Sequence, residues 1–154
     1  MHTHNRRFGR LGLVVLLLMG VLAIPTSSAA STGTAELVGT IRFAEEVPLA
    51  NPEPMSAGGG FQGLVTTDTF QGLVNCSFSA SVVESVVQGH GTGTLNCASG
   101  GNSASCGVAY THVGTTVTGN MSCSGQIMPP SPIIVCVVVY VPPNAYFVCV
   151  IVSL

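Results

Sequence analysis

The chain has no tryptophan and no lysine, and only 6% of its 154 residues are charged. Disordered chains combine abundant charge with low hydrophobicity, whereas 47% of these residues are hydrophobic, so the sequence is not that of a disordered protein. Coiled coils and helical bundles are rich in glutamate, lysine, leucine and arginine. The scarcity of charge therefore excludes them as well.

The little positive charge that exists is concentrated at the N-terminus. Three arginines within the first ten residues precede the apolar run Leu11–Ile24, and the small residues Ser28–Ala30 follow it. This order predicts a cleaved secretory signal helix at residues 1–30 and a single secreted, extracellular domain at residues 31–154. The apolar run has 14 residues, fewer than the roughly 20 that a membrane-spanning helix needs. We therefore expect no stable membrane insertion after signal cleavage.

Cleavage would leave a weakly acidic domain. Removal of residues 1–30 takes three of the four arginines. Arg42 is then the one basic residue beside six acidic residues, which gives a formal net charge of −5. A single cation cannot neutralise a run of phosphates, which excludes nucleic acid as a partner. Anionic lipid headgroups are disfavoured for the same reason.

All six cysteines lie in the expected secreted domain. An even number of cysteines behind a signal peptide indicates disulfides. A metal site would call for close pairs such as C-x2-C, and the shortest spacing here leaves eight residues between two cysteines. Pairing the apolar runs around the turn at Pro142–Asn144, and the strands around Gly114–Thr115, opposes two pairs of cysteines, and the third pair follows by elimination. The expected bridges are Cys136–Cys149, Cys106–Cys123 and Cys76–Cys97.

Apolar and polar residues alternate with a period of two along most of the domain, as in Phe70–Ala80. Glycine-rich turn signals such as Gly89–Gly91 and Ser99–Asn102 separate these segments. Eight or nine short strands of this kind are typical of a sandwich or a small barrel. Of the two, we expect an all-β, antiparallel, immunoglobulin-like β-sandwich.

Two segments interrupt the regular pattern. The sequence of Phe61–Val65 recurs nine residues later as Phe70–Val74, and a hairpin is the simplest placement for the two copies. Ala44–Gly60 carries three of the six acids among prolines and glycines, which predicts a long loop. That loop is a solvated connection, a binding loop or a weak calcium site. Its acids do not follow the ligand spacing of a known calcium loop, which favours the connection.

No segment matches a catalytic or cofactor motif. His90 and His112 have no second histidine at metal-ligand spacing, and we expect both to be turn or strand-end residues. The serine-rich Gly101–Ser105 lacks the second glycine of a nucleophile elbow, and Gly89–Gly93 lacks the lysine of a phosphate-binding loop. A carbohydrate site would also need aromatic platforms, and the chain has no tryptophan and only three tyrosines. We expect no enzymatic activity, no catalytic residue, no cofactor and no bound metal.

The arginine-rich signal ending in Ser28–Ala30, the segment Gly91–Cys97 and the terminal Tyr146–Val150 resemble those of small secreted, disulfide-bonded all-β proteins of Gram-positive bacteria. Most proteins of that kind have no assigned function, so the resemblance implies a compartment and a fold class but no site. In composition the chain is also similar to the neocarzinostatin-type chromophore carriers, which are acidic immunoglobulin-like sandwiches, although six cysteines depart from their usual four.

The C-terminal hairpin has two apolar faces, whereas a strand of a sandwich ordinarily has one polar face. Either other segments cover both faces, or one face is an exposed contact surface for a partner or for self-association. The candidate contact residues are Val135, Val137, Val139, Val148 and Val150. The first expectation is therefore a secreted, non-enzymatic surface or interaction protein. The alternative is a carrier that holds a small apolar ligand between its sheets.

Overall fold

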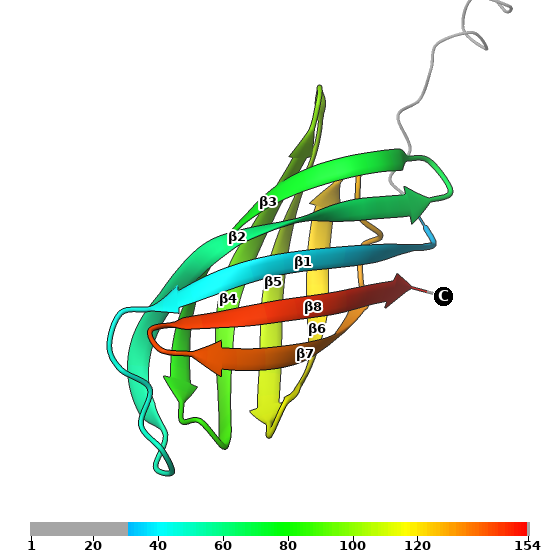
Figure 1. Ribbon diagram of the computed structural model, residues 1–154. Helices are drawn as coiled ribbons and strands as arrows, with labels where there is room; N and C mark the ends of the chain where they lie inside the picture. The colour runs from blue at the N-terminus through cyan, green and yellow to red at the C-terminus, as the bar shows by residue number, and fades with distance from the viewer. Residues whose placement is uncertain (1–30, 154) are drawn as a thin grey trace, which may run out of the picture.

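The computed structural model describes residues 31–153, which form one closed barrel of eight antiparallel strands (Figure 1). Each strand pairs with the next one along the chain, and the first pairs with the last. The expected signal peptide lies outside the described residues. Within residues 31–153, no helix is long and apolar enough to cross a membrane. The strands are β1 (Gly33–Phe43), β2 (Glu53–Thr67), β3 (Gln71–Glu84), β4 (Gln88–Ser99), β5 (Asn102–Val113), β6 (Thr116–Gly125), β7 (Ile133–Val141) and β8 (Asn144–Ser153).

The expected β-sandwich is wrong, because the sheet closes on itself. Leu37 of β1 is paired with Gly63 of β2 on one side and with Cys149 of β8 on the other, so β1 is not an edge strand. The strands are also longer than expected, up to 15 residues in β2. Long strands joined in sequence order can coil around a common axis, and closure then removes the unpaired edges that a sandwich keeps.

The expected loop at Ala44–Gly60 is also wrong in extent. The connection between β1 and β2 covers only residues 44–52, and β2 begins at Glu53. The three glycines lie within β2, where Gly59 pairs with Ile41 of β1 and with Phe78 of β3. A Cβ atom on Gly59 would overlap the carbonyl oxygen of Thr40. Glycine here permits the close approach of two coiled strands and does not mark a loop.

The repeated sequence forms the β2–β3 hairpin, as expected. Leu64 of the first copy pairs with Leu73 of the second, so the two copies run side by side in opposite directions. Along every strand the side chains alternate between the barrel interior and the outer surface. On β4, for example, Leu95 and Cys97 are buried, and Thr94 and Asn96 between and beside them are exposed.

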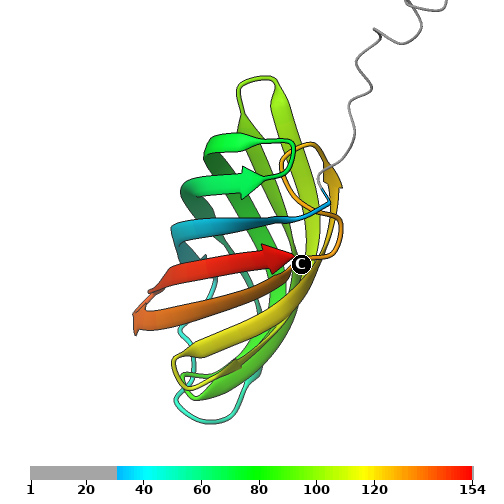
Figure 2. The ribbon, with the colours of Figure 1, turned by 90° about the vertical axis from the view of Figure 1, so that its right-hand side faces the viewer.

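The two ends of the barrel differ. At the end where β1 begins, Ile127 and Met128 from the β6–β7 connection are fully buried and pack into the main core with Val65 and Val74. Figure 2 shows this connection curling over the barrel at that end. We call it the closed end. The opposite end, called the mouth, carries the β1–β2 connection and the tight turns that follow β3, β5 and β7 (Figure 1).

Candidate functional site

A cavity of about 310 Å³ occupies the barrel interior toward the mouth. Most of its lining is hydrocarbon, contributed by all strands of the barrel and by the mouth connections. The largest lining side chains are those of Phe43, Phe61, Phe78, Tyr110, Tyr140 and Phe147. An eight-stranded barrel has an interior just wide enough either to be filled by side chains or to hold one small ligand. Side chains therefore do not fill the interior of this barrel completely.

Small residues on the inner face leave this space open. Ala57 and Ala145 line the cavity, where a larger side chain at either position would project into it. The phenylalanines stand against the wall, with the ring of Phe61 6.2 Å from that of Phe78 and 6.0 Å from that of Phe147. The ring of Phe61 reaches Phe147 across Gly39 of β1, which has no side chain to intervene.

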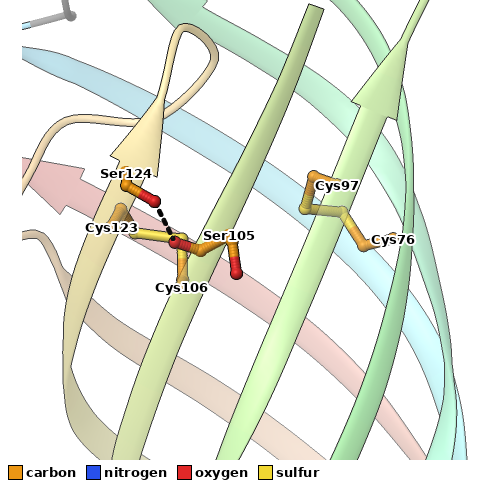
Figure 3. The surroundings of a disulfide bond; sticks show 6 residues. All are labelled: Cys76, Cys97, Ser105, Cys106, Cys123 and Ser124. Carbon is orange, nitrogen blue, oxygen red and sulfur yellow. Dashed lines mark hydrogen bonds between the residues drawn. A yellow bond between two sulfur atoms is a disulfide. The ribbon is translucent and has the colours of Figure 1, made fainter.

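Three disulfides cross-link neighbouring strands of the barrel, and they are the three expected pairs, two predicted from hairpin register and the third by elimination. They join Cys76 to Cys97, Cys106 to Cys123 and Cys136 to Cys149. Figure 3 shows the first two bridging β3 to β4 and β5 to β6, beside a hydrogen bond from the Ser124 hydroxyl to the Ser105 carbonyl oxygen. Each bridge joins directly opposed residues. Three disulfide bonds are typical of extracellular proteins.

The disulfides also shape the interior. Five of the six cysteines are buried, and the Cys136–Cys149 bridge lines the cavity. No disulfide joins β8 to β1. The contact between β8 and β1 is therefore held by strand pairing, while three of the hairpins are also held covalently.

The connection between β1 and β2 covers the mouth. Val47 is only 6% exposed and lines the cavity, and its backbone N–H donates to the Tyr140 hydroxyl at 3.2 Å. The carbonyl oxygen of Pro48 accepts a hydrogen bond of 2.8 Å from the backbone N–H of Val86. Glu45 and Glu46 point away from the cavity and are exposed. No group of three or more His, Cys, Asp or Glu side chains suited to a metal ion occurs within residues 31–153.

A polar cluster lies in the cavity wall just inside the mouth. The carboxylate of Glu84 is buried and accepts a hydrogen bond of 2.7 Å from the Tyr110 hydroxyl. Its second oxygen lies 2.9 Å from Nδ1 of His112, whose Nε2 lies 2.6 Å from the carbonyl oxygen of Gly114. All four residues line the cavity. They are the polar part of an otherwise apolar chamber.

Two glycines of β4 make this cluster possible. Gly89 stands between Glu84 and His112 in the register, and Gly91 stands between Val82 and Tyr110. A Cβ on Gly89 would overlap the carboxylate of Glu84, and one on Gly91 would lie 2.8 Å from the Tyr110 ring. Because β4 has no side chain here, Glu84 of β3 reaches across it to two side chains of β5.

The surroundings of His112 favour its charged form. Each ring nitrogen lies within hydrogen-bond distance of an oxygen atom, and an imidazolium can donate from both nitrogens. The hydrogen bond to Glu84, supported by the one to Gly114, raises the pKa of His112 above its usual value in spite of burial. Burial, followed by the charge of Glu84, raises the pKa of Tyr110, so this hydroxyl stays neutral.

Both histidines lie near the end of a strand, as expected, but their surroundings differ. His90 lies on the exposed face of β4 and not in a turn, since the turn is formed by the residues after Glu84. His112 lies near the end of β5 as expected, but it is buried and paired with a carboxylate. The alternation of residues in the sequence indicates that both side chains lie on the inner face, because Glu84 lies on the same strand face as Val82 and His112 on the same face as Val108. That Glu84 and His112 meet depends on the register of β3, β4 and β5, and alternation does not give this register.

The five candidate contact valines lie together on the outer surface. Val135 is paired with Val150, and Val137 with Val148, which is in turn beside Val38 of β1. Their exposed fractions range from 45% for Val135 and Val150 to 62% for Val148. Ile133, Val141 and Tyr146 extend the same surface. This sector, called the valine face, differs from the outer surface of β4, which presents threonine and asparagine.

Comparison with family models, with curated proteins and with solved structures gives no match. The function is therefore argued from this geometry alone.

Proposed function

We propose that the protein binds a small apolar molecule in the cavity of the barrel and acts as an extracellular carrier. The observation that supports this proposal is the cavity of about 310 Å³ with its hydrocarbon lining. An engineered apolar cavity of roughly 150 Å³ already binds benzene, so this one has room for a ligand of about twice that size. The expected signal peptide and the disulfides fit a carrier that works outside the cell.

An empty cavity of this size would be expensive for a domain of this length. Cavities in protein cores cost roughly 24 cal/mol per Å³, so 310 Å³ left unfilled would cost on the order of 7 kcal/mol. That is comparable with the whole stability of a typical domain, about 5–15 kcal/mol. The hydrocarbon part of the lining offers no hydrogen-bond partner to an ordered water. Occupation by a ligand would offset this cost.

The mouth connection provides the means of access. Val47 and Pro48 hold residues 44–52 over the opening through one hydrogen bond each, to Tyr140 and from Val86. Two exchangeable hydrogen bonds and one inserted valine are a small barrier compared with separating two neighbouring strands such as β2 and β3, which pair at fourteen positions. A ligand enters by lifting this connection and is enclosed when it returns.

Fluorescence titration of the secreted protein with N-phenyl-1-naphthylamine, an uncharged apolar probe, tests the proposal. We expect saturable binding at one site, with a blue-shifted emission. Ala57→Phe places a ring in the cavity and should abolish binding, while Ala109→Phe adds the same ring to the outer face of β5 and should leave binding intact. Equal binding by the two variants would show that the probe sits elsewhere and would refute the carrier function.

We propose as a second function that two copies associate through the valine face, an assignment supported by the contiguous exposure of its valines. A second copy is the favoured partner because of the flanking charges on β1. Glu36 and Arg42 are both exposed and lie three positions either side of Gly39. A two-fold axis crossing β1 at Gly39 brings Glu36 of one copy toward Arg42 of the other.

Sedimentation velocity over a range of concentrations tests this second function. We expect a reversible dimer that Arg42→Glu weakens through charge repulsion and that the exchange variant Glu36→Arg/Arg42→Glu restores. A protein that remains monomeric at the highest concentration would refute self-association.

A further inference from the structure

The polar groups of the cavity wall restrict the chemistry of the ligand, an inference that rests on the proposed carrier function. Among the residues that line the cavity, Glu84 and His112 are the acidic and basic side chains. Arg42 and the exposed Glu45 and Glu46 are directed to solvent. Any charged group on a ligand would therefore have to be balanced by this one pair.

The pair is already balanced within itself. One carboxylate oxygen of Glu84 faces Nδ1 of His112 at 2.9 Å, and the other accepts from the Tyr110 hydroxyl at 2.7 Å. The second nitrogen of His112 donates to the carbonyl oxygen of Gly114 at 2.6 Å. The carboxylate and the imidazolium cancel, and every donor of the imidazolium is in use. Neither group is left to neutralise a charge on a ligand.

A charged head group would thus enter a chamber with no counter-ion. Moving an ion from water into a protein interior costs several kcal/mol unless an opposite charge repays it. A neutral head group escapes that cost. The Tyr140 hydroxyl, which lines the cavity and accepts from Val47, keeps its own hydrogen to donate to an oxygen acceptor.

We propose that the ligand is an uncharged apolar molecule, such as a hydrocarbon alcohol, ketone or ester, and that the cavity wall, in which Glu84 and His112 neutralise each other, excludes carboxylate and ammonium amphiphiles of the same length. The pair acts as a neutral filter in the wall, and selection is by charge as well as by size.

Displacement of bound N-phenyl-1-naphthylamine by octan-1-ol, octanoate and octylammonium at pH 7 tests the filter, since the three share one chain and differ in head group. We expect octanol to displace the probe at a concentration at least roughly tenfold lower than either ion, which corresponds to about 1.4 kcal/mol or more. Displacement by octanoate or octylammonium at the same concentration as octanol would overturn the filter while leaving the carrier function in place. Failure of the probe itself to bind would refute the carrier function.

Two variants test whether the neutrality of the wall sets this preference. His112→Gln leaves the carboxylate of Glu84 without its counter-ion and should improve displacement by octylammonium relative to octanol by about tenfold. The double variant Glu84→Gln/His112→Gln removes both charges, can keep a hydrogen bond between the two amides and should restore the preference for octanol. If the single variant does not fold, the double variant still decides, because a preference for either ion in that variant would contradict selection by a neutral wall.

Discussion

Glu84 of β3 and His112 of β5 form an ion pair of 2.9 Å across the intervening strand β4, over the position of Gly89. The pair spans two strand spacings of the barrel wall because the middle strand contributes no side chain. One glycine thus determines whether an acidic and a basic group inside the cavity can neutralise each other.

Gly89→Ala should break this pair, because the added Cβ overlaps the carboxylate of Glu84. Displacing one member leaves a buried charge without its partner, and we expect the free energy of unfolding to fall by about 2–4 kcal/mol. Gly107→Ala is the matched control, since its Cβ would meet only the Ser122 carbonyl oxygen at 3.9 Å, and its effect should stay within about 1 kcal/mol. Urea unfolding measures both. Equal stability of the two variants would show that Glu84 can reach His112 around a methyl group.

The raised pKa of His112 makes stability depend on pH in the neutral range. The folded protein holds the imidazolium proton more tightly than the unfolded chain, where the pKa is about 6.5. The stabilisation is therefore complete below that value and is lost as the pH rises through the raised pKa of the folded state. We expect urea midpoints to fall between pH 6.5 and the alkaline side of that pKa. The Glu84→Gln/His112→Gln variant should lack this decline, and a parallel decline in it would assign the effect to other groups.

Local pairing explains why the disulfides could be predicted and the closure of the barrel could not. Cys136 and Cys149 lie in one hairpin, so turn position and a period of two suffice to oppose them. Pairing of β1 with β8 joins segments more than a hundred residues apart, and alternation carries no information on it. Closure also determines where the two apolar faces of the C-terminal hairpin lie. One face lines the interior, and the other is exposed.

The misread glycines share a single physical cause. The glycines at Gly58–Gly60 and at Gly89–Gly91 predict a loop and a turn, yet both groups lie inside strands. At Gly59 the absent side chain allows two backbones to approach, and at Gly89 it allows a side chain to pass over the strand. Both requirements arise from neighbours that are distant in sequence. The cavity and the Glu84–His112 pair were missed for the same reason, whereas the small-ligand alternative depended only on composition.

Removing one disulfide should destabilise the barrel without unfolding it. The bridges close segments of 21, 17 and 13 residues, for which restriction of the unfolded chain gives about 3 kcal/mol each. We expect Cys136→Ala/Cys149→Ala to lose about that amount and also to alter probe binding, because this bridge lines the cavity. Cys106→Ala/Cys123→Ala is the control, with a similar loss of stability and unchanged binding.

Intact mass before and after reduction should differ by six hydrogens, and an unchanged mass would contradict all three bridges.

Val137 and Val138 are neighbours in β7 that differ in exposure, with 58% of Val137 and 8% of Val138 accessible to solvent. Val137→Lys places an ammonium on the outer surface, so we expect the variant to be secreted and folded, with its stability within about 1 kcal/mol of the parent. Val138→Lys places the same group in the barrel interior, where it has no partner, and should prevent folding.

Val137→Lys also tests whether the valine face is a contact surface. If two copies associate through this face, Val137→Lys buries a charge within the contact and should abolish the dimer. Thr94→Lys, on the exposed face of β4 across the barrel, should leave the dimer intact. Circular dichroism establishes that each variant is folded, and sedimentation velocity measures association. A folded Val137→Lys protein that dimerises like Thr94→Lys would remove the valine face from the contact, whereas loss of folding would show that these valines stabilise the barrel itself.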